Sequence, residues 1–159
     1  MSDLVGIKQR LLLDQIGDDP AARLVLALHT TTRRIDAACA QLLAEHQLSE
    51  GRLAALLAVV DEPGLSPRTL ADRLDVTTAT VTGLLDGLER AGLIERRAHE
   101  TDRRARVLVP TSEGERLVAS LTPIYADWLV RLADGIGPEA LEVTEQVLAT
   151  LQANVTEHP

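Results

Sequence analysis

Residues 66–115 decide the fold of this chain, and they read SPRTLADRLDVTTATVTGLLDGLERAGLIERRAHETDRRARVLVPTSEGE. The pattern of apolar, polar and turn-forming residues predicts one short helix, a second helix with a threonine-rich start, and a β-hairpin, in that order. This is the order of a winged helix-turn-helix, which places its second helix in a DNA groove and its hairpin against the neighbouring groove. Residues 66–115 are therefore predicted to form a DNA-binding unit.

Capping residues mark the ends of the two predicted helices. Ser66 followed by Pro67 is typical of an N-cap and a first helical position, so a short helix is expected to begin there. Thr77 predicts the N-cap of the second helix, which is expected to run to about Arg90 and to be stopped by Gly92.

On a helical wheel the second helix has two unlike faces. Apolar side chains gather on one side, which is expected to face the short helix: Val81, Leu84, Leu85 and Leu88. Predicted DNA contacts lie in the first turn and on the other side: Thr77, Thr78, Ala79, Thr80, Thr82, Gly83 and Arg90. Threonine can bond base edges and pack its methyl on thymine, and amides at a helix start suit a phosphate. An ordinary amphipathic helix with a capped start would show the same pattern.

The hairpin, with strands predicted at 94–97 and 106–109, is the locally cationic part of the chain. Between residues 90 and 106 there are six arginines against three acidic residues. The predicted contacts of this wing are Arg97, Asp102, Arg103, Arg104 and Arg106. Arg104 at the tip is expected to enter a narrow minor groove, with Asp102 orienting its guanidinium. The alternative is a solvated turn whose charges keep a strand edge from aggregating.

Helices are also expected on both sides of this unit. Before it, an amphipathic stretch lies within residues 1–19, a long helix is predicted over 21–46, and Ser49 predicts the cap of a helix to about residue 60.

After the hairpin, Ser112 and Glu115 predict a capping box that starts a helix to about Ala133. Pro123 is expected to kink or split that helix, and Pro138 to open a last one.

The predicted fold is mainly α with a small β-hairpin. A winged helix-turn-helix DNA-binding domain over 48–111 is bracketed by an N-terminal arm and dimerisation helix over 1–47 and by C-terminal dimerisation helices over 112–159. The outer helices carry apolar stripes richer than one small core needs, so we expect a homodimer.

Charge, hydrophobicity and cysteine count limit the kinds of protein that this chain can be. The net charge is −8, and all of it lies outside residues 66–116, where nine arginines balance nine acidic residues. No apolar run reaches the length of a membrane span, so no membrane partner is expected. The single Cys39 excludes an internal disulfide and favours a reducing compartment, which predicts a cytoplasmic protein.

The stretch from Leu70 to Leu117 resembles the MarR family of regulators. The resemblance rests on TVTGLLDGLERAGLIER at 80–96, on Asp102-Arg103-Arg104, and on Thr111-Ser112-Glu113-Gly114. It implies a transcription regulator, ligand-responsive and repressing, that acts as a homodimer on pseudo-palindromic double-stranded DNA. It also implies a recognition helix at 77–90 and a wing whose Arg104 is held by Asp102.

One departure from that family concerns Gly83 and Gly87, where many members have basic residues. Two glycines inside a helix cost about 1 kcal/mol each relative to alanine, and two potential DNA contacts are absent. These glycines and the net charge of −8 favour the alternative function, a winged-helix module for protein–protein contact that has lost DNA binding. The arginine-rich wing opposes it.

The resemblance also implies a small aromatic or anionic effector, bound between the dimer helices and the winged domain. By position the candidates are His29, Arg33, Tyr125 and Trp128. Each has an ordinary structural explanation, namely an interface histidine, a solvated charge, and aromatic packing in an aliphatic core.

Several other functions are not predicted. No glycine-rich phosphate loop, nucleophile elbow or histidine paired with a nucleophile is present, so no enzyme and no cofactor are expected. No Cys, His, Asp and Glu cluster has metal-ligand spacing. Cys39 lies among alanines within a predicted helix, where a buried thiol is unreactive, so peroxide sensing is not expected.

Overall fold

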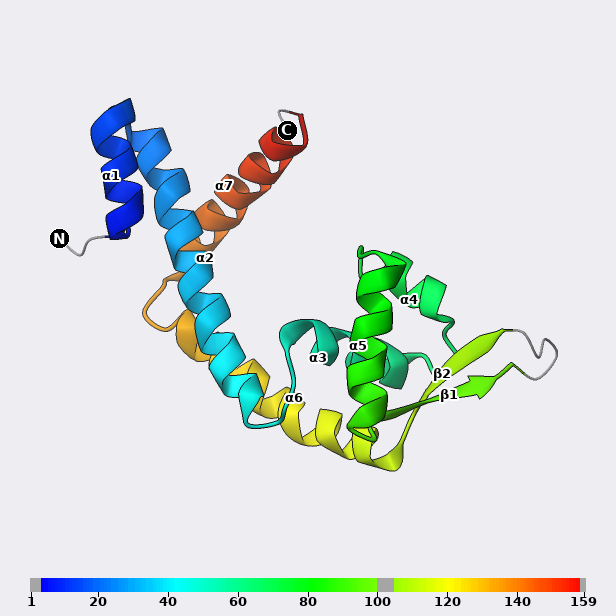
Figure 1. Cartoon of the computed structure of the whole chain (residues 1–159). Helices are drawn as coiled ribbons and strands as arrows, with labels where there is room; N and C mark the ends of the chain where they lie inside the picture. Colours follow the sequence, from blue (N-terminus) through cyan, green and yellow to red (C-terminus); the bar gives the residue numbers. More distant parts are fainter. Residues whose placement is uncertain (1–3, 100–104, 158–159) are drawn as a thin grey trace. The chain divides into compact units, whose positions relative to one another are not determined.

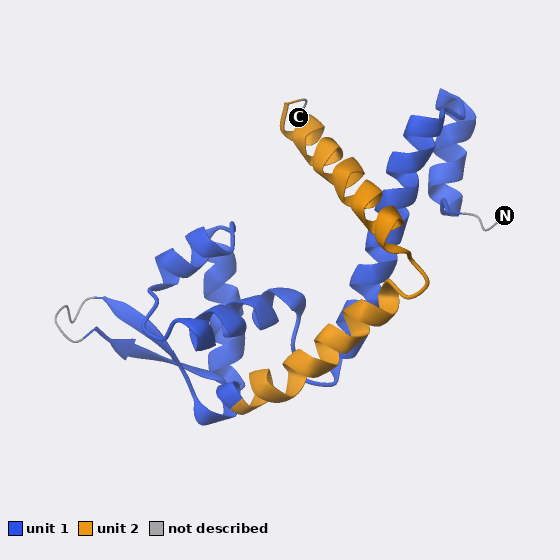
Figure 2. Ribbon diagram, turned by 180° about the vertical axis from the view of Figure 1, so that it is seen from behind, with its two compact units in different colours: residues 1–115 blue, residues 116–159 orange. Residues whose placement is uncertain are grey.

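The computed structural model describes residues 4–99 and 105–157. These residues form helices and one hairpin in the following order (Figure 1): α1 (Ile7–Ile16), α2 (Pro20–Ala44), α3 (Glu50–Asp61), α4 (Pro67–Arg73), α5 (Thr78–Arg90), β1 (Ile94–Ala98), β2 (Arg106–Pro110), α6 (Ser112–Leu132) and α7 (Pro138–Glu157). The mainly α fold with a small hairpin is confirmed. The chain divides into two compact units, residues 1–115 and 116–159 (Figure 2).

Side-chain caps at Ser49 and Ser66 start α3 and α4 where the sequence predicts them. Ser49 Oγ accepts from the Arg52 amide at 3.3 Å, and Ser66 Oγ accepts from the Thr69 amide at 3.0 Å. Asp19 caps α2 by accepting from the amide of Ala21 at 2.8 Å. These bonds satisfy amides that the first turn of a helix leaves without a carbonyl partner.

The core of the first unit is aliphatic and lies where α3, α4, α5 and the hairpin meet. α5 contacts both α3 and α4, and β2 contacts α3. Its fully buried side chains come from each of these elements and include Leu56, Val59, Leu70, Val81, Leu85, Leu88, Ile94 and Leu108. The chain has no phenylalanine and only one tryptophan and one tyrosine. Leucine, valine and isoleucine side chains therefore fill the core.

The hairpin is anchored on both sides. β1 and β2 pair antiparallel, with Arg97 opposite Val107 and Ile94 opposite Pro110. The segment between α3 and α4 also bonds to β2, since the Gly64 amide donates to the Leu108 carbonyl at 2.8 Å and the Leu108 amide to the Leu65 carbonyl at 2.9 Å. The wing strands therefore extend from the core of the unit.

The start of α6 differs from the prediction by one residue. The cap is Thr111 rather than Ser112, because Thr111 Oγ1 accepts from the Gly114 amide at 3.0 Å. The same hydroxyl donates to the Gly92 carbonyl at 2.7 Å, and the Thr111 amide donates to the Leu93 carbonyl at 3.1 Å. Thr111 is the cap because it also bonds to the turn after α5. A pattern of neighbouring residues in the sequence does not predict such bonds.

The second unit consists of the rest of α6 and of α7. Of the two outcomes expected at Pro123, a kink or a split, the split does not occur, because α6 runs through it from Ser112 to Leu132. One proline removes one amide donor, and the turns on either side keep the helix continuous. On α6 the rings of Tyr125 and Trp128 lie 5.3 Å apart between centroids. α7 has no buried residue along its 20 positions.

Candidate nucleic-acid interface

The N-terminal end of α5 presents threonines and free helix amides. Thr77 is the predicted N-cap, and its Oγ1 accepts from the Thr80 amide at 3.2 Å and lies 2.9 Å from Thr80 Oγ1. Thr77, Thr78, Ala79 and Thr80 are all exposed. No acidic residue occupies the first turn, so nothing there opposes the positive end of the helix dipole. This end of α5 suits an anionic group such as a phosphate.

Farther along α5 the exposed face is shaped by bonds within the helix. Thr82 Oγ1 donates to the Thr78 carbonyl at 2.9 Å, so its hydrogen is used and its lone pairs face outward. Nothing within 4 Å would meet a Cβ at Gly83, which leaves that side of the helix open. Arg90 is exposed and its Nε donates to the Asp86 carbonyl at 3.0 Å.

The opposite face of α5 packs as the helical wheel predicts. Val81, Leu85 and Leu88 have no exposed surface, while Leu84 is half-buried at the edge of this face. The packing fixes which side of α5 is available to a partner, and it leaves Thr82 and Gly83 on the available side.

Gly87 does not lie on the open face, which corrects the sequence interpretation. It is buried, and a Cβ there would lie 2.4 Å from Nε of Arg52 on α3. The glycine makes room for an arginine of the neighbouring helix, so a side chain at position 87 would point at Arg52.

Arg96 links β1 to α5, a contact that the sequence did not reveal. From β1 its Nη2 lies 2.6 Å from Oδ1 of Asp86, and its Nη1 lies 3.1 Å from Oε2 of Glu89. The Arg96 side chain is only 26% exposed, less than either carboxylate. A hint lies in the spacing of Asp86 and Glu89, which puts two carboxylates on adjacent positions of one helix face.

The two described wing residues among the predicted contacts, Arg97 and Arg106, are exposed on the strands. Arg97 is tied to its own strand, with Nη2 at 2.9 Å from Oε2 of Glu95. Asp102, Arg103 and Arg104 lie outside the described residues, so the structure does not test the predicted tip.

The four candidate effector residues divide between the two units. His29 and Arg33 are exposed on α2 in the first unit, and Arg33 lines a cavity between α1 and α2 while His29 does not. Tyr125 and Trp128 are half-buried on α6 in the second unit. Cys39 on α2 is a buried thiol.

Two other expectations concern the described ranges, 4–99 and 105–157. Within them, no helix is long and apolar enough to span a membrane. The same residues contain no group of three or more His, Cys, Asp or Glu side chains that could hold a metal ion.

Comparison with known protein sequences identifies a family. A family model described as the MarR family matches residues 46–105. The HTH-type transcriptional repressor YetL of Bacillus subtilis is 31% identical over 136 residues, which make up 84% of this chain and 81% of YetL.

Two solved structures show how far the fold agrees. The MarR family transcription regulator SP03579 superposes with a TM-score of 0.76 at 22% identity, over 96% of this chain and 99% of that one. FabT of Streptococcus pneumoniae, solved in complex with DNA, gives a TM-score of 0.70 at 24% identity, over 86% of this chain and 98% of that one.

Proposed function

The chain belongs to the MarR family of transcription regulators, and we propose that it represses transcription as a ligand-responsive homodimer bound to pseudo-palindromic operators. The observation that carries this proposal is the arrangement of buried and exposed residues on α5. Its apolar face is buried, its threonine-rich start is exposed, and Arg96 holds it to the wing. The family consists of regulators, and we assign no catalytic activity.

In this proposal α5 lies in the major groove. The amides of its first turn hold a phosphate and fix the register on the duplex, while Thr78, Ala79 and Thr82 face base edges. Because the Thr82 hydroxyl already donates to the Thr78 carbonyl, it serves as an acceptor, which suits the amino groups of adenine and cytosine. The open side at Gly83 permits close approach of the helix backbone.

The wing supplies the second part of the contact. Arg97 and Arg106 on the strands, with Arg103 at the tip, are proposed to lie along the phosphate backbone. Arg104, oriented by Asp102, is proposed to enter the adjacent minor groove, where a narrow groove concentrates negative potential. The ion pairs of Arg96 with Asp86 and Glu89 support this proposal, because they connect the wing to α5.

Dimerisation is proposed for residues 1–47 and 112–159, with the DNA-binding domain over 48–111 between them. Large apolar side chains lie exposed on both outer parts of the chain, including Leu11, Leu12, Leu24 and Val25, and Leu141 and Val143 on α7. Such surface on helices that one protomer does not cover supports a symmetric partner. Two-fold symmetry would set the recognition helices about one DNA turn apart.

The ligand response is proposed to involve a small aromatic or anionic effector, with His29, Arg33, Tyr125 and Trp128 as its candidate contacts. Because the effector acts on a DNA-bound regulator, the protein is expected where the DNA is, in the cytoplasm. Effector binding is proposed to favour a dimer geometry that no longer matches the operator half-sites.

Two measurements on the purified protein test this function. Titration against the DNA upstream of its own gene, at two salt concentrations, should show saturable binding that weakens at higher salt. Sedimentation should show a dimer at micromolar concentration. A monomer, or no preference for that DNA over a scrambled duplex, would contradict the proposal. The latter result would favour a winged-helix module for protein contact, in keeping with the net charge of −8.

A further inference from the structure

A cationic cavity lies between α1 and α2, within the first unit and apart from α5 and the wing. Its volume is about 380 Å³, within the usual size range of small-molecule pockets, about 300–1,000 Å³. The lining comes from the start of α1 and the middle of α2: Gly6, Ile7, Lys8, Gln9, Thr30, Arg33, Arg34 and Ala37. Three of these side chains are cationic and none is acidic, in a chain whose net charge is −8.

Some of the described arginines are neutralised by carboxylates, and the three cations of this cavity are not. Arg23, Arg73, Arg96, Arg97 and Arg131 each pair with a carboxylate. Within the part of the chain that the structure describes, no carboxylate pairs with Lys8, Arg33 or Arg34. Three like charges around one hollow repel one another, and a bound anion would relieve that repulsion.

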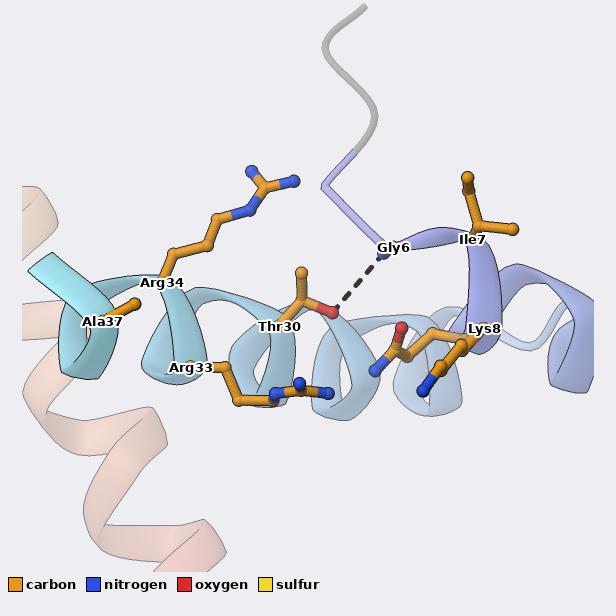
Figure 3. A pocket seen from close by; sticks show the side chains of 8 residues that line it. Gly6, Ile7, Lys8, Thr30, Arg33, Arg34 and Ala37 are labelled. Carbon is orange, nitrogen blue, oxygen red and sulfur yellow. Dashed lines mark hydrogen bonds between the residues drawn. The ribbon is translucent and has the colours of Figure 1, made fainter.

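One hydrogen bond links the two sides of the cavity. Thr30 is buried, its Oγ1 donates to the Leu26 carbonyl at 2.9 Å, and it accepts from the Gly6 amide at 3.4 Å. Figure 3 shows Arg33 and Arg34 leaving α2 on either side of Thr30, with Lys8 reaching in from α1 on the side of Arg33. The three cations therefore lie around Thr30.

The start of α1 adds donors to the same side of the cavity. Gly6 is its N-cap and offers no side-chain cap, and the first turn has no acidic residue. The first-turn amides of α1 therefore add partial positive charge beside Lys8. Ile7, Ala37 and the aliphatic stems of the arginines give the cavity an apolar wall as well.

We propose that this α1–α2 cavity is a binding site for a small organic anion, with one carboxylate or phosphate group on an apolar body. Arg33, Arg34 and Lys8 would hold the anionic group, arginine with its forked donors and lysine as a point charge. The apolar body would lie against Ala37 and the aliphatic stems of the arginines. The site deepens the proposed ligand response and rests on it for its effect on DNA binding, while the binding itself is independent of it.

The test is calorimetric titration of the whole protein at low ionic strength. Benzoate and phenyl phosphate serve as the two anionic probes, inorganic phosphate as an anion without an apolar body, and benzamide as the neutral match for benzoate. The expected result is saturable binding of benzoate or phenyl phosphate, or of both, at one site per chain, weaker binding of phosphate, and no measurable binding of benzamide. The stronger of the two organic probes identifies the anionic group.

Variants locate the site. Arg34→Gln and Lys8→Gln should each weaken binding on the order of tenfold or more, because each removes a charge-assisted contact. Arg23→Gln, on the same helix but outside the cavity, removes an equal charge and should leave binding within about twofold, an estimate for a screened surface charge. Amide NMR shifts on benzoate addition should gather at residues 6–9 and 30–37.

Several results would overturn the site. These are no binding of either organic probe, equal loss of binding in Arg23→Gln, amide shifts outside the cavity, or benzamide binding as tightly as benzoate. If Arg34→Gln instead weakens the dimer and leaves probe binding unchanged, the cations meet carboxylates of a second copy and the proposal is wrong. DNA titration of the same samples without probe reports the proposed function separately, so either idea can fail alone.

Discussion

Arg96 on β1 and Asp86 on α5 form an ion pair with 2.6 Å between Nη2 and Oδ1, and this pair joins the hairpin to α5. A second carboxylate, Glu89, lies 3.1 Å from Nη1 of the same arginine. One planar guanidinium therefore spans two carboxylates, which orders the side chain once for two contacts. The arrangement joins β1 to two positions of α5 through one side chain.

Replacing Arg96 should cost little folding stability. Arg96→Ala is expected to lower the free energy of unfolding by only about 1 kcal/mol, because the network is partly exposed and screened. A cycle with Asp86→Ala should give a coupling energy of about 0.5–1 kcal/mol by denaturant unfolding. The matched control is Arg97→Ala, whose exposed pair with Glu95 lies within one strand and should change stability by less than about 0.5 kcal/mol. A coupling energy of zero would show that the pair does not hold the wing.

Gly114 and Gly83 provide an opposed pair of glycine substitutions. A Cβ at Gly114 would lie 2.2 Å from the Leu93 carbonyl oxygen, so Gly114→Ala must move the start of α6 and should cost about 1–3 kcal/mol. Gly83→Ala meets nothing within 4 Å in a helix interior and should stabilise by about 0.5–1 kcal/mol. Urea unfolding of the two variants measures both. Equal effects would contradict the close approach at Gly114.

The cap of α5 can be tested without touching its buried face. Thr77→Ala removes the oxygen that accepts from the Thr80 amide and should destabilise the protein by about 1 kcal/mol. Thr77→Ser keeps the hydroxyl and should recover most of that loss in thermal unfolding. If serine fails where alanine fails, the threonine methyl and not the cap is responsible.

Cys39 is expected to be a packing residue. It is buried on α2, so peroxide should not reach it readily and a buried apolar thiol is a poor nucleophile. Peroxide treatment should leave DNA affinity the same in the natural protein and in Cys39→Ser. A release of DNA by peroxide that disappears in the variant would identify a redox sensor.

Local chemistry made most of the helices predictable from the sequence. The caps at Ser49, Ser66 and Thr77 depend on bonds three residues along the chain, so their positions follow from the sequence alone. The buried face of α5 also follows from its period. The start of α6 was placed one residue late, because Thr111 is selected by the carbonyls of Gly92 and Leu93.

The functional face was harder to predict because tertiary neighbours decide it. A helical wheel counts Gly87 as a lost contact, yet Arg52 from α3 occupies the space beside it. The wing arginines look alike in sequence, and only the fold separates Arg96, which grips α5, from Arg97, which pairs along its own strand. The cavity lined by Lys8 and Arg34 lies between α1 and α2. The contact between these two helices could not be predicted from neighbouring residues in the sequence.

The most direct test of DNA recognition is competition binding of operator and scrambled duplexes across a salt series, with Arg104→Ala beside the unchanged protein. The unchanged protein should prefer the operator and lose affinity as salt rises. Arg104→Ala should weaken binding to every duplex that has the narrow groove, and lower the salt slope by about one unit per lost contact per protomer. Thr82→Val should instead cost about 1–3 kcal/mol on the operator and little on scrambled DNA. If Arg104→Ala leaves both affinity and salt slope unchanged, the wing is not a DNA element and the account is contradicted.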